Sequence, residues 1–409
     1  MRRRDFLKFS AVASLVIPLS SRAWAIRNNE GSGKRVIVIF LRGAADGLSV
    51  VVPYSDSLYY EMRPTIALQR PGIPNGVLDL DGQFGLHPSL VGMKPFWDEK
   101  SLAFIHASGS PDPTRSHFTA QAYMESGTPG PRSTEDGWLN RSMAYMDGTH
   151  AATQAVSWGA NQPHILRGRM PVAVMSGGRN PMKSDVQMDM TAQTIFDQLY
   201  SGSDALSVAY REGQESQRQL LAALQKDVKE ANMDARATGD FVYDARTMAR
   251  LMRNDRSIQI CFAALGGWDT HINQGAHQGQ LAKSLKSLSD GLTTLRTDLG
   301  SLYADTVVLV ISEFGRAVHE NGNSGTDHGH GNVMWAMGGP VNGGRVYGLW
   351  PGLDEENLYE QRDLAITTDF RAVISTVLTG HLMIAPRDIA KIFPSMPAQS
   401  GHVATLIHT

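Results

Sequence analysis

The sequence predicts an α/β protein in which a mainly parallel central sheet is flanked by helices. Four runs of continuous apolar residues have the length and composition of strands buried on both faces. They occupy residues 36–41, 101–107, 257–265 and 306–312. Stretches with helical periodicity alternate with these runs, as expected when helices cover both faces of a parallel sheet. The expected helices are 88–98, 118–125, 136–146, 277–302 and 369–382, and the expected shorter strands are 155–158, 171–175 and 333–337.

The N-terminal residues 1–25 have the pattern of an export signal. Arg3 and Arg4 open a twin-arginine motif, an apolar stretch follows at 9–19, and Ala23-Trp24-Ala25 is an A-x-A cleavage site. The apolar stretch is too short for a stable membrane span, which needs about 20 apolar residues. We therefore expect the twin-arginine export machinery to deliver the protein to the periplasm or outside the cell, with residues 26–409 folded as a single domain.

Composition excludes several classes of function. The chain has 38 basic and 40 acidic residues and a net charge of -2, so charge gives no reason to expect nucleic acid or an anionic membrane as a partner. Cys261 is the one cysteine, and no disulfide can form within the chain. It lies in an apolar run, so we expect a buried small hydrophobic residue.

An acidic residue follows the first predicted strand. Asp46 is flanked by alanine and Gly47 just beyond residues 36–41. Ligands of open α/β sheets bind outside the carboxyl ends of the strands, so Asp46 is a candidate metal ligand. The alternative is a simple turn residue before glycine. Residues 53–88, rich in Pro, Gly and Tyr, are expected to be irregular.

Hydroxyl side chains follow the second predicted strand. Thr114, Arg115 and Ser116 lie at a turn that leads into the helix expected at 118–125. The N-terminus of a helix offers unpaired N–H groups and the positive end of its dipole, and arginine can hold an oxyanion. Ser116 or Thr114 is thus a candidate nucleophile with Arg115 as an anion-binding partner. The alternative is that Ser116 only caps the helix.

A long proline-free stretch, residues 191–253, is expected to form an inserted helical segment on the sheet. The strand that follows it ends in Gly266-Gly267-Trp268-Asp269-Thr270-His271. Asp269 and His271, two residues apart, can reach one metal from an extended segment. The alternative is a structural histidine beside a capping aspartate.

The fourth strand, 306–312, ends directly at Glu313, and Arg316 follows. A loop rich in glycine and asparagine then leads to Asp327 and His328. Carboxylate and imidazole groups are ligands of divalent metals such as Zn²⁺ and Mn²⁺, although a polar surface loop that happens to contain histidine is the simpler alternative. If the four strands are parallel and adjacent, all these groups converge on one edge of the sheet.

Several ordered motifs together resemble the domain-of-unknown-function 1501 family, whose members are exported, often by the twin-arginine route. The resemblance extends from about Val36 to Leu382. It rests on Leu41-Arg42-Gly43-Ala44-Ala45-Asp46-Gly47, Val52-Pro53-Tyr54, Gly267-Trp268-Asp269-Thr270-His271, Ser312-Glu313-Phe314-Gly315-Arg316 and Asp327-His328.

This family is similar in layout to the alkaline phosphatase and sulfatase superfamily, which implies an alkaline-phosphatase-like fold and a site for one or two metals. There, an aspartate after the first strand binds metal, a hydroxyl or modified cysteine at a helix N-terminus is the nucleophile, and later Asp/His pairs complete the site. The matching residues are Asp46, then Thr114 or Ser116, then Asp269 with His271, then Asp327 with His328.

The chain departs from the superfamily at two places. Ser312-Glu313-Phe314-Gly315 stands where Ser-Asp-His-Gly is usual, so one imidazole ligand is missing and Glu313 must substitute or act differently. The nucleophile turn has no cysteine, which excludes a formylglycine mechanism.

These observations predict an exported metal-dependent hydrolase of phosphate or sulfate esters. Six residues would hold a divalent metal, Zn²⁺ or Mn²⁺, and Arg115 and Arg316 would bind the anionic substrate. One alternative is a non-catalytic periplasmic binding or assembly protein on a degenerate hydrolase scaffold, and another is a structural Ca²⁺ site. The expected metal ligands are Asp46, Asp269, His271, Glu313, Asp327 and His328.

Overall fold

The computed structural model describes residues 33–130, 134–146, 154–159, 161–175, 232, 235–397 and 401–408. The predicted signal peptide and the predicted helical insertion up to residue 231 lie outside these residues. In the described part of the chain, no helix is long and apolar enough to cross a membrane.

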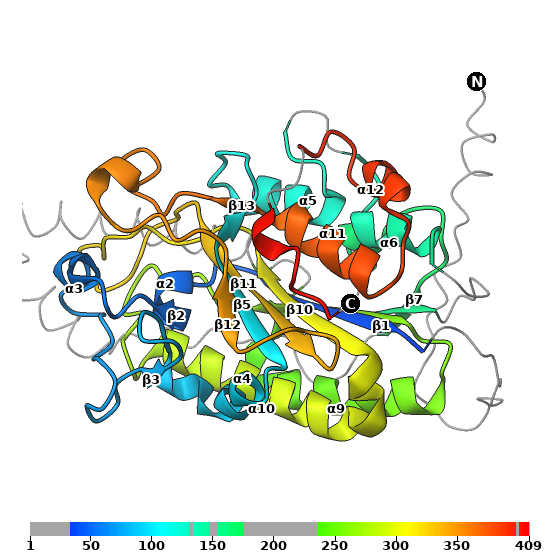
Figure 1. Ribbon diagram of the computed structural model, residues 1–409, viewed down its shortest axis with the longest axis horizontal. Coiled ribbons are helices and arrows are strands. Elements are labelled where there is room, and N and C mark those ends of the chain that lie inside the picture. Colours follow the sequence, from blue (N-terminus) through cyan, green and yellow to red (C-terminus); the bar gives the residue numbers. More distant parts are fainter. Residues whose placement is uncertain are drawn as a thin grey trace, which may run out of the picture.

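A ten-stranded sheet forms the middle of the molecule (Figure 1). Its order is β12-β5-β11-β10-β1-β9-β6-β7, with β13 paired to β5 and β8 paired to β9. The strands are β1 (Arg35–Leu41), β5 (Leu102–Gly109), β6 (Ala155–Trp158), β7 (Ala173–Met175), β8 (Arg236–Ala237), β9 (Ile260–Gly266), β10 (Thr306–Ser312), β11 (Asn332–Gly338), β12 (Arg345–Tyr347) and β13 (Thr368–Asp369).

The central strands are parallel, as the sequence predicts. β1 pairs in parallel with both β9 and β10, and every residue of these three strands is buried. Among the pairings of the described sheet, only those of β11 are antiparallel, and β11 lies between β10 and β5. The four predicted strands thus all point the same way. Three of them are adjacent, and the condition that all four are adjacent is not met, because β11 separates β5 from the others.

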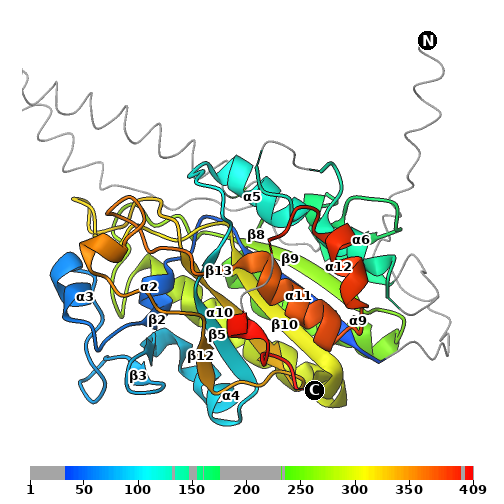
Figure 2. The same cartoon turned by 45° about the horizontal axis from the view of Figure 1, so that its top comes forward.

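Helices cover both faces of the sheet, which confirms the predicted fold class (Figures 1 and 2). Alternate residues of β1 face opposite layers: Ile37 and Ile39 belong to one hydrophobic core, and Val36 and Val38 to the other. The first core packs against η1 (Pro88–Met93), α4 (Lys94–Asp98), α9 (Phe241–Asn254) and α10 (Gln280–Leu299). The second packs against α5 (His117–Ser126), α6 (Trp138–Met143), α11 (Phe370–Gly380) and α12 (Pro386–Ile392).

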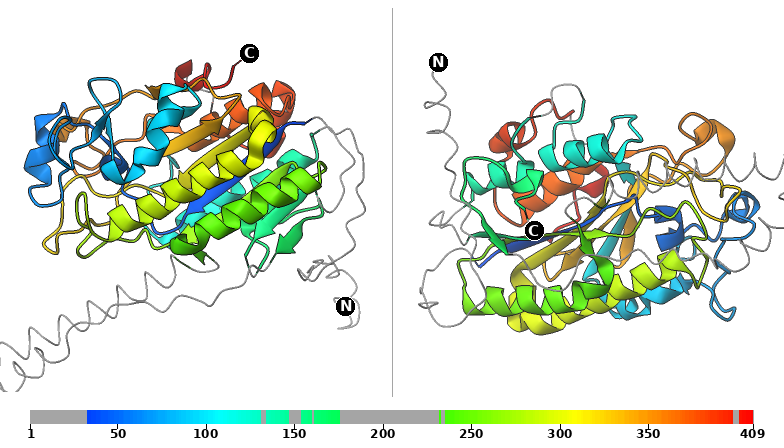
Figure 3. Two further views of the ribbon diagram at one scale, coloured as in Figure 1. Left: turned by 90° about the horizontal axis from the view of Figure 1, so that it is seen from below. Right: turned by 180° about the vertical axis from the view of Figure 1, so that it is seen from behind.

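Helices α9 and α10 lie side by side across one face of the sheet (Figure 3, left). Apolar residues at helical spacing along α9, from Phe241 to Met252, are buried in the core. Gly291 of α10 allows the close approach, since an added Cβ would lie 2.1 Å from the Phe241 ring. The part of the predicted insertion that the structure describes is therefore a layer of the core.

The segment between β1 and β5 contains more regular structure than expected. It includes α2 (Gly47–Val50), α3 (Ser57–Met62) and a small antiparallel sheet of β2 (Val51–Val52), β4 (Gly85–Leu86) and β3 (Leu78–Asp79). Arg63 follows α3 and is completely buried. This segment thereby carries a cation into the interior beneath the carboxyl ends of the strands.

Candidate metal centre

The carboxyl ends of parallel β1, β9 and β10 meet at one edge of the sheet, where ligands of such sheets bind. The turn after β9 brings Asp269 and His271 to this edge, and the loop between β10 and β11 brings His328. Gly43, with φ of +116°, permits close packing after β1, because a Cβ there would lie 2.6 Å from the Asp269 nitrogen. The first residue of α5, His117, completes the group.

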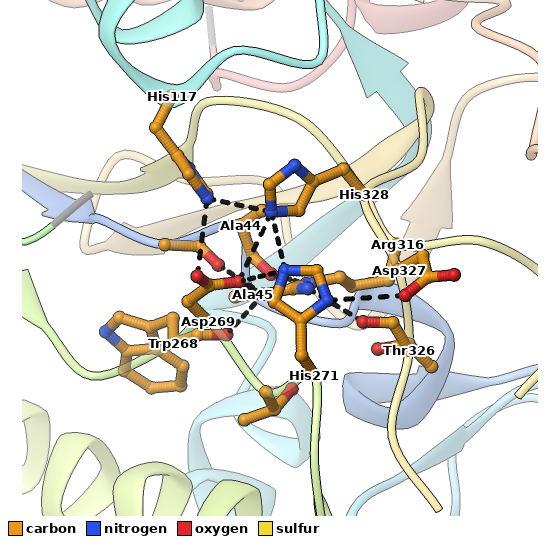
Figure 4. A network of polar contacts seen from close by, with 12 residues as sticks. Ala44, Ala45, His117, Trp268, Asp269, His271, Arg316, Thr326, Asp327 and His328 are labelled. Carbon is orange, nitrogen blue, oxygen red and sulfur yellow. Dashed lines mark hydrogen bonds and ion pairs between the residues drawn. The ribbon is translucent and has the colours of Figure 1, made fainter. Parts of the chain in front are cut away.

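Ligand atoms of His117, Asp269 and His328 all lie within 4.8 Å of one another at this edge, and His271 lies against His328 and Asp269 (Figure 4). The Nε2 atom of His328 lies 2.9 Å from the Nε2 of His117 and 2.9 Å from the Nε2 of His271. Asp269 Oδ1 is 3.0 Å from His271 Nε2 and 3.3 Å from His328 Nε2, and its Oδ2 is 3.6 Å from His117 Nε2. These four residues, His117, Asp269, His271 and His328, are called the centre below.

The second nitrogen of each imidazole has its own acceptor. His117 Nδ1 lies 2.8 Å from Glu313 Oε1, and His328 Nδ1 lies 2.9 Å from the Arg115 carbonyl oxygen. His271 Nδ1 lies 3.3 Å from Asp327 Oδ1. Since an acceptor holds the proton on Nδ1, each neutral ring directs the lone pair of Nε2 towards the others. Metal-binding histidines are oriented in this way.

The residues of the centre fit a divalent metal. Three lone pairs facing one another repel unless a cation or a proton lies between them. The Asp269 Oδ2 atom is buried and has no hydrogen-bond partner, and buried carboxylate oxygens normally have one. Three imidazoles with one carboxylate suit Zn²⁺, and also Mn²⁺ or Fe²⁺. Imidazole nitrogens sharing one Zn²⁺ at about 2.0–2.1 Å are roughly 3.3 Å apart, so the observed spacing needs a small outward movement of the rings.

The electrostatic surroundings also favour positive charge at this point. Burial alone would lower the pKa of His117, yet the neighbouring carboxylates of Asp269 and Glu313 outweigh it and raise the pKa to about 9. The pKa of His271 is likewise raised, since Asp269 and Asp327 outweigh its burial. The pKa of His328 is lowered by burial. Two nitrogens 2.9 Å apart cannot both carry protons, and one metal cation would satisfy all three rings.

Glu313 and Asp327, which the sequence predicts as metal ligands, do not belong to the centre. They contact the outer nitrogens, Nδ1, of its histidines. Glu313 is fully buried, and its Oε1 also accepts from the Gly43 nitrogen at 2.8 Å and from Gln121 at 3.0 Å. Asp327 accepts from Asn321 at 3.0 Å, and its side chain is 55% exposed. Each carboxylate holds the far nitrogen of one histidine, so each orients a ligand and increases its basicity.

Asp46, also predicted as a ligand, is not brought to the centre. Arg63 donates two hydrogen bonds to the Asp46 carboxylate, of 2.6 and 3.1 Å. Ser49 and Gln274 each donate to its Oδ2 atom at 2.7 Å. Both residues of the ion pair are completely buried. Burial would raise the pKa of Asp46, but the Arg63 guanidinium outweighs it and holds the pKa low. A protein cation takes the place of a metal here.

Arg316, predicted to bind an anionic substrate, is buried and fully engaged. It donates to the carbonyl oxygens of Ala44 and Gly43 at 2.7 Å and to that of Thr326 at 2.8 Å, and it pairs with Asp269 Oδ1. These bonds join the turn after β1 to the loop before β11. Arg316 therefore clamps the segments that carry the centre.

The predicted nucleophile region lies beside the centre. Ser116 is exposed and occupies the N-cap position of α5 without a side-chain capping bond, and the Thr114 hydroxyl accepts from the Ser116 nitrogen at 3.2 Å. Arg115 pairs with Asp363 and Glu360 at 2.6 and 2.7 Å. Among the described contacts, none joins these three side chains to the centre, although the Arg115 carbonyl orients His328.

The sequence reasoning missed His117 as a ligand. Its position in the sequence could have indicated it, because His117 directly follows Ser116 at the strand-to-helix turn that contains the candidate nucleophiles. The Phe314 ring stacks against His117 with ring centroids 5.0 Å apart and lies 5.1 Å from the His328 ring. His117 thus supplies a third imidazole from another element.

Comparison with known proteins identifies the family. The sequence matches the family described as "Protein of unknown function (DUF1501)" over residues 33–393. No curated protein matches the chain.

Solved structures of similar arrangement have low sequence identity. Ps i-CgsB, solved with k-i-k-neocarrahexaose, is 10% identical with a TM-score of 0.41, and the match covers 86% of this chain and 72% of that one. A protein in the alkaline phosphatase superfamily from Vibrio parahaemolyticus is 10% identical with a TM-score of 0.35, covering 83% and 69%. The C-terminal periplasmic domain of EcEptC from Escherichia coli, in complex with Zn, is 8% identical with a TM-score of 0.36, covering 76% and 74%.

Proposed function

The chain belongs to the DUF1501 family, and we propose that it is an exported metal-dependent hydrolase of phosphate or sulfate esters. One observation carries the metal dependence: ligand atoms of His117, Asp269 and His328 lie within 4.8 Å of one another, and His271 Nε2 lies 2.9 Å from His328 Nε2. The ester class follows from the resemblance of the strand-end motifs to the alkaline phosphatase and sulfatase superfamily. The twin-arginine motif supports export to the periplasm or beyond.

In this proposal the centre holds one divalent metal, Zn²⁺ or Mn²⁺. Such an ion supplies a Lewis acid and lowers the pKa of a bound water, which makes a nucleophile available at neutral pH. Glu313 and Asp327 keep the protons on the Nδ1 atoms of His117 and His271, and Arg316 fixes the Asp269 carboxylate. Metal binding at the centre therefore requires His117 to release the Nε2 proton that its raised pKa favours.

The open side of the centre determines where a substrate approaches. His117 and Asp269 side chains are 3% and 1% exposed, whereas those of His271 and His328 are 12% and 14% exposed. Asp327 stands at this open side, where its contacts with His271 and Asn321 lower its pKa, so it positions His271 and is a weak base. Because the Ser116 and Thr114 hydroxyls do not contact the centre, the geometry favours water over either hydroxyl as the nucleophile.

Metal analysis of the mature protein, purified from its exported form without chelator, tests the proposal together with a screen of chromogenic phosphate monoesters, diesters and sulfate esters. We expect about one equivalent of metal and ester turnover in the wild type. His328→Ala should lose both, and His277→Ala, which changes an exposed histidine outside the centre, should lose neither.

Two other outcomes would decide against the proposal. A folded wild-type protein that takes up no Zn²⁺ or Mn²⁺ would remove the metal centre. Tight binding of metal, with no turnover of any ester class, would favour the periplasmic binding or assembly protein on a hydrolase-like scaffold.

A further inference from the structure

We infer that Gln274 is a positioning residue that sets the spacing of the metal ligands, an inference that rests on the proposed metal-dependent function. Gln274 is completely buried in the segment between β9 and α10. It contacts no residue of the centre through its side chain. It instead connects two ligand-bearing loops to the Asp46–Arg63 ion pair beneath them.

The side chain of Gln274 makes three close hydrogen bonds. Its Nε2 donates to Asp46 Oδ2 at 2.7 Å, and its Oε1 accepts from the hydroxyls of Thr270 and Thr326 at 2.7 and 2.8 Å. Thr270 stands between Asp269 and His271 in the chain, and Thr326 directly precedes Asp327 and His328. One amide thereby joins the segments that supply three of the four ligands.

The partners of Gln274 fix the orientation of its amide. Asp46, held ionised by Arg63, can only accept hydrogen bonds, so the amide nitrogen must face it. The amide oxygen is then the acceptor for both threonines, and a flipped amide would present oxygen to a carboxylate. The buried ion pair thus determines the direction of the bonds that hold the two loops.

Backbone contacts show that the two loops form one unit around Gln274. The Thr326 nitrogen donates to the Thr270 carbonyl oxygen at 3.1 Å, and the Gln274 nitrogen donates to the Ser324 carbonyl oxygen at 2.9 Å. Gly325 packs so tightly that a Cβ would lie 2.2 Å from the His271 carbonyl oxygen. The separation between His271 and His328 therefore depends on these contacts between the two loops. His117 is placed independently of them, by α5.

Gln274→Met tests the inference, because methionine has a similar length and no strong hydrogen-bonding group. Gln278→Met is the matched control, four positions further along and exposed. One sample of the mature protein is loaded with Zn²⁺, and the rate at which a chelator removes the metal is measured. A second sample is loaded with Co²⁺, and its visible absorption spectrum is recorded. Outer partners of metal ligands typically change metal affinity about 10–100-fold, and we expect about tenfold faster Zn²⁺ loss and a shifted Co²⁺ spectrum in Gln274→Met alone.

Thr326→Val removes the hydrogen bond from the Thr326 hydroxyl to Gln274 with little change in side-chain shape. This variant tests the inference if Gln274→Met does not fold. We expect the same two changes, smaller in size. The rise in Tm on Zn²⁺ binding should also shrink in both variants, since weaker binding stabilises the folded state less.

A merely structural glutamine would give a different pattern. It would lower Tm equally with and without metal, and the Zn²⁺ loss rate and Co²⁺ spectrum would match the wild type in Gln274→Met and Thr326→Val, which would overturn the inference. A wild type that binds no metal would overturn the proposed function as well. A wild type that binds metal without turnover would overturn the hydrolase and leave this inference supported by the metal measurements.

Discussion

Asp46 and Asp269 follow neighbouring parallel strands, yet their surroundings differ. Each is buried at the carboxyl end of its strand. Both oxygens of Asp46 are bonded by protein groups, with Arg63 supplying the neutralising charge. Asp269 pairs with Arg316 through Oδ1, and its Oδ2 has no hydrogen-bond partner and lies 3.6 Å from His117 Nε2. The difference teaches that an acidic residue after a strand marks the edge of a sheet, while the partner brought from elsewhere decides its role.

The same contrast separates two kinds of buried histidine. His106 has both ring nitrogens satisfied by the backbone, since it accepts from the Ala107 nitrogen at 3.0 Å and its Nε2 lies 2.9 Å from the Val51 carbonyl oxygen. The histidines of the centre have an external partner on Nδ1 alone. A ring with two backbone partners is structural, and a ring whose second nitrogen faces other imidazoles is a candidate ligand.

The largest expected effect comes from breaking the Asp46–Arg63 pair. Asp46→Ala leaves a buried guanidinium without its counter-charge, which typically costs about 3–5 kcal/mol of stability. We expect this loss in denaturant unfolding of the metal-free protein. His328→Ala, a change within the centre, should alter the unfolding free energy of the metal-free protein far less. Unchanged stability of Asp46→Ala combined with loss of metal would instead make Asp46 a ligand.

A second prediction concerns pH and the histidines outside the centre. Burial lowers the pKa of His106 to about 4, below its unfolded value near 6.5. Between these values the unfolded chain binds a proton that the folded protein excludes, so stability falls as pH drops from 6.5 towards 4. At pH 5 this amounts to about 2 kcal/mol from His106.

Denaturant unfolding of metal-free protein at pH 7 and pH 5 measures this loss. His106→Asn should reduce the difference between the two pH values by about the same 2 kcal/mol. His402→Asn, at an exposed position, should leave it as in the wild type. Equal pH dependence in the wild type and His106→Asn would show that His106 already carries a proton in the folded state or shifts little on unfolding.

The smallest predicted effect concerns the carboxylate behind His117. Glu313→Gln keeps the shape of the side chain and removes the charge that supports the Nδ1 proton. We expect the Zn²⁺ dissociation constant to rise about tenfold, equivalent to about 1.4 kcal/mol. Competition with a chelator measures it, and Glu356→Gln at an exposed position is the control. Complete loss of metal from Glu313→Gln would point to Glu313 as a direct ligand.

Much of the fold was predictable because continuous apolar runs mark buried parallel strands. The positions of β1, β9 and β10 follow directly from the apolar composition of these segments. The position of β11 was not predictable, since its direction depends on pairing between residues distant in the chain. Its insertion beside β10 is the reason that the four strands are not adjacent.

The centre was predictable where ligands occur in short motifs. Asp269, His271 and His328 were selected as ligands from their position after strands, and the structure brings them together. His117 was missed because a single histidine at a helix start has no sequence partner. Asp46 was assigned to the metal because nothing near it in sequence indicates that Arg63 folds back to neutralise it. Local sequence patterns indicate which side chains lie at the carboxyl ends of the strands. Their partners there depend on tertiary contacts, which the local sequence does not show.

Phe314 has a consequence for the strength of charge interactions at the centre. Its ring lies against both His117 and His328 and is almost fully buried. Such an apolar wall excludes polarisable water and lowers the local dielectric constant, and charge interactions strengthen as that constant falls. Charge interactions at the centre are therefore screened more on the partly exposed side of His271 than on the side of Phe314.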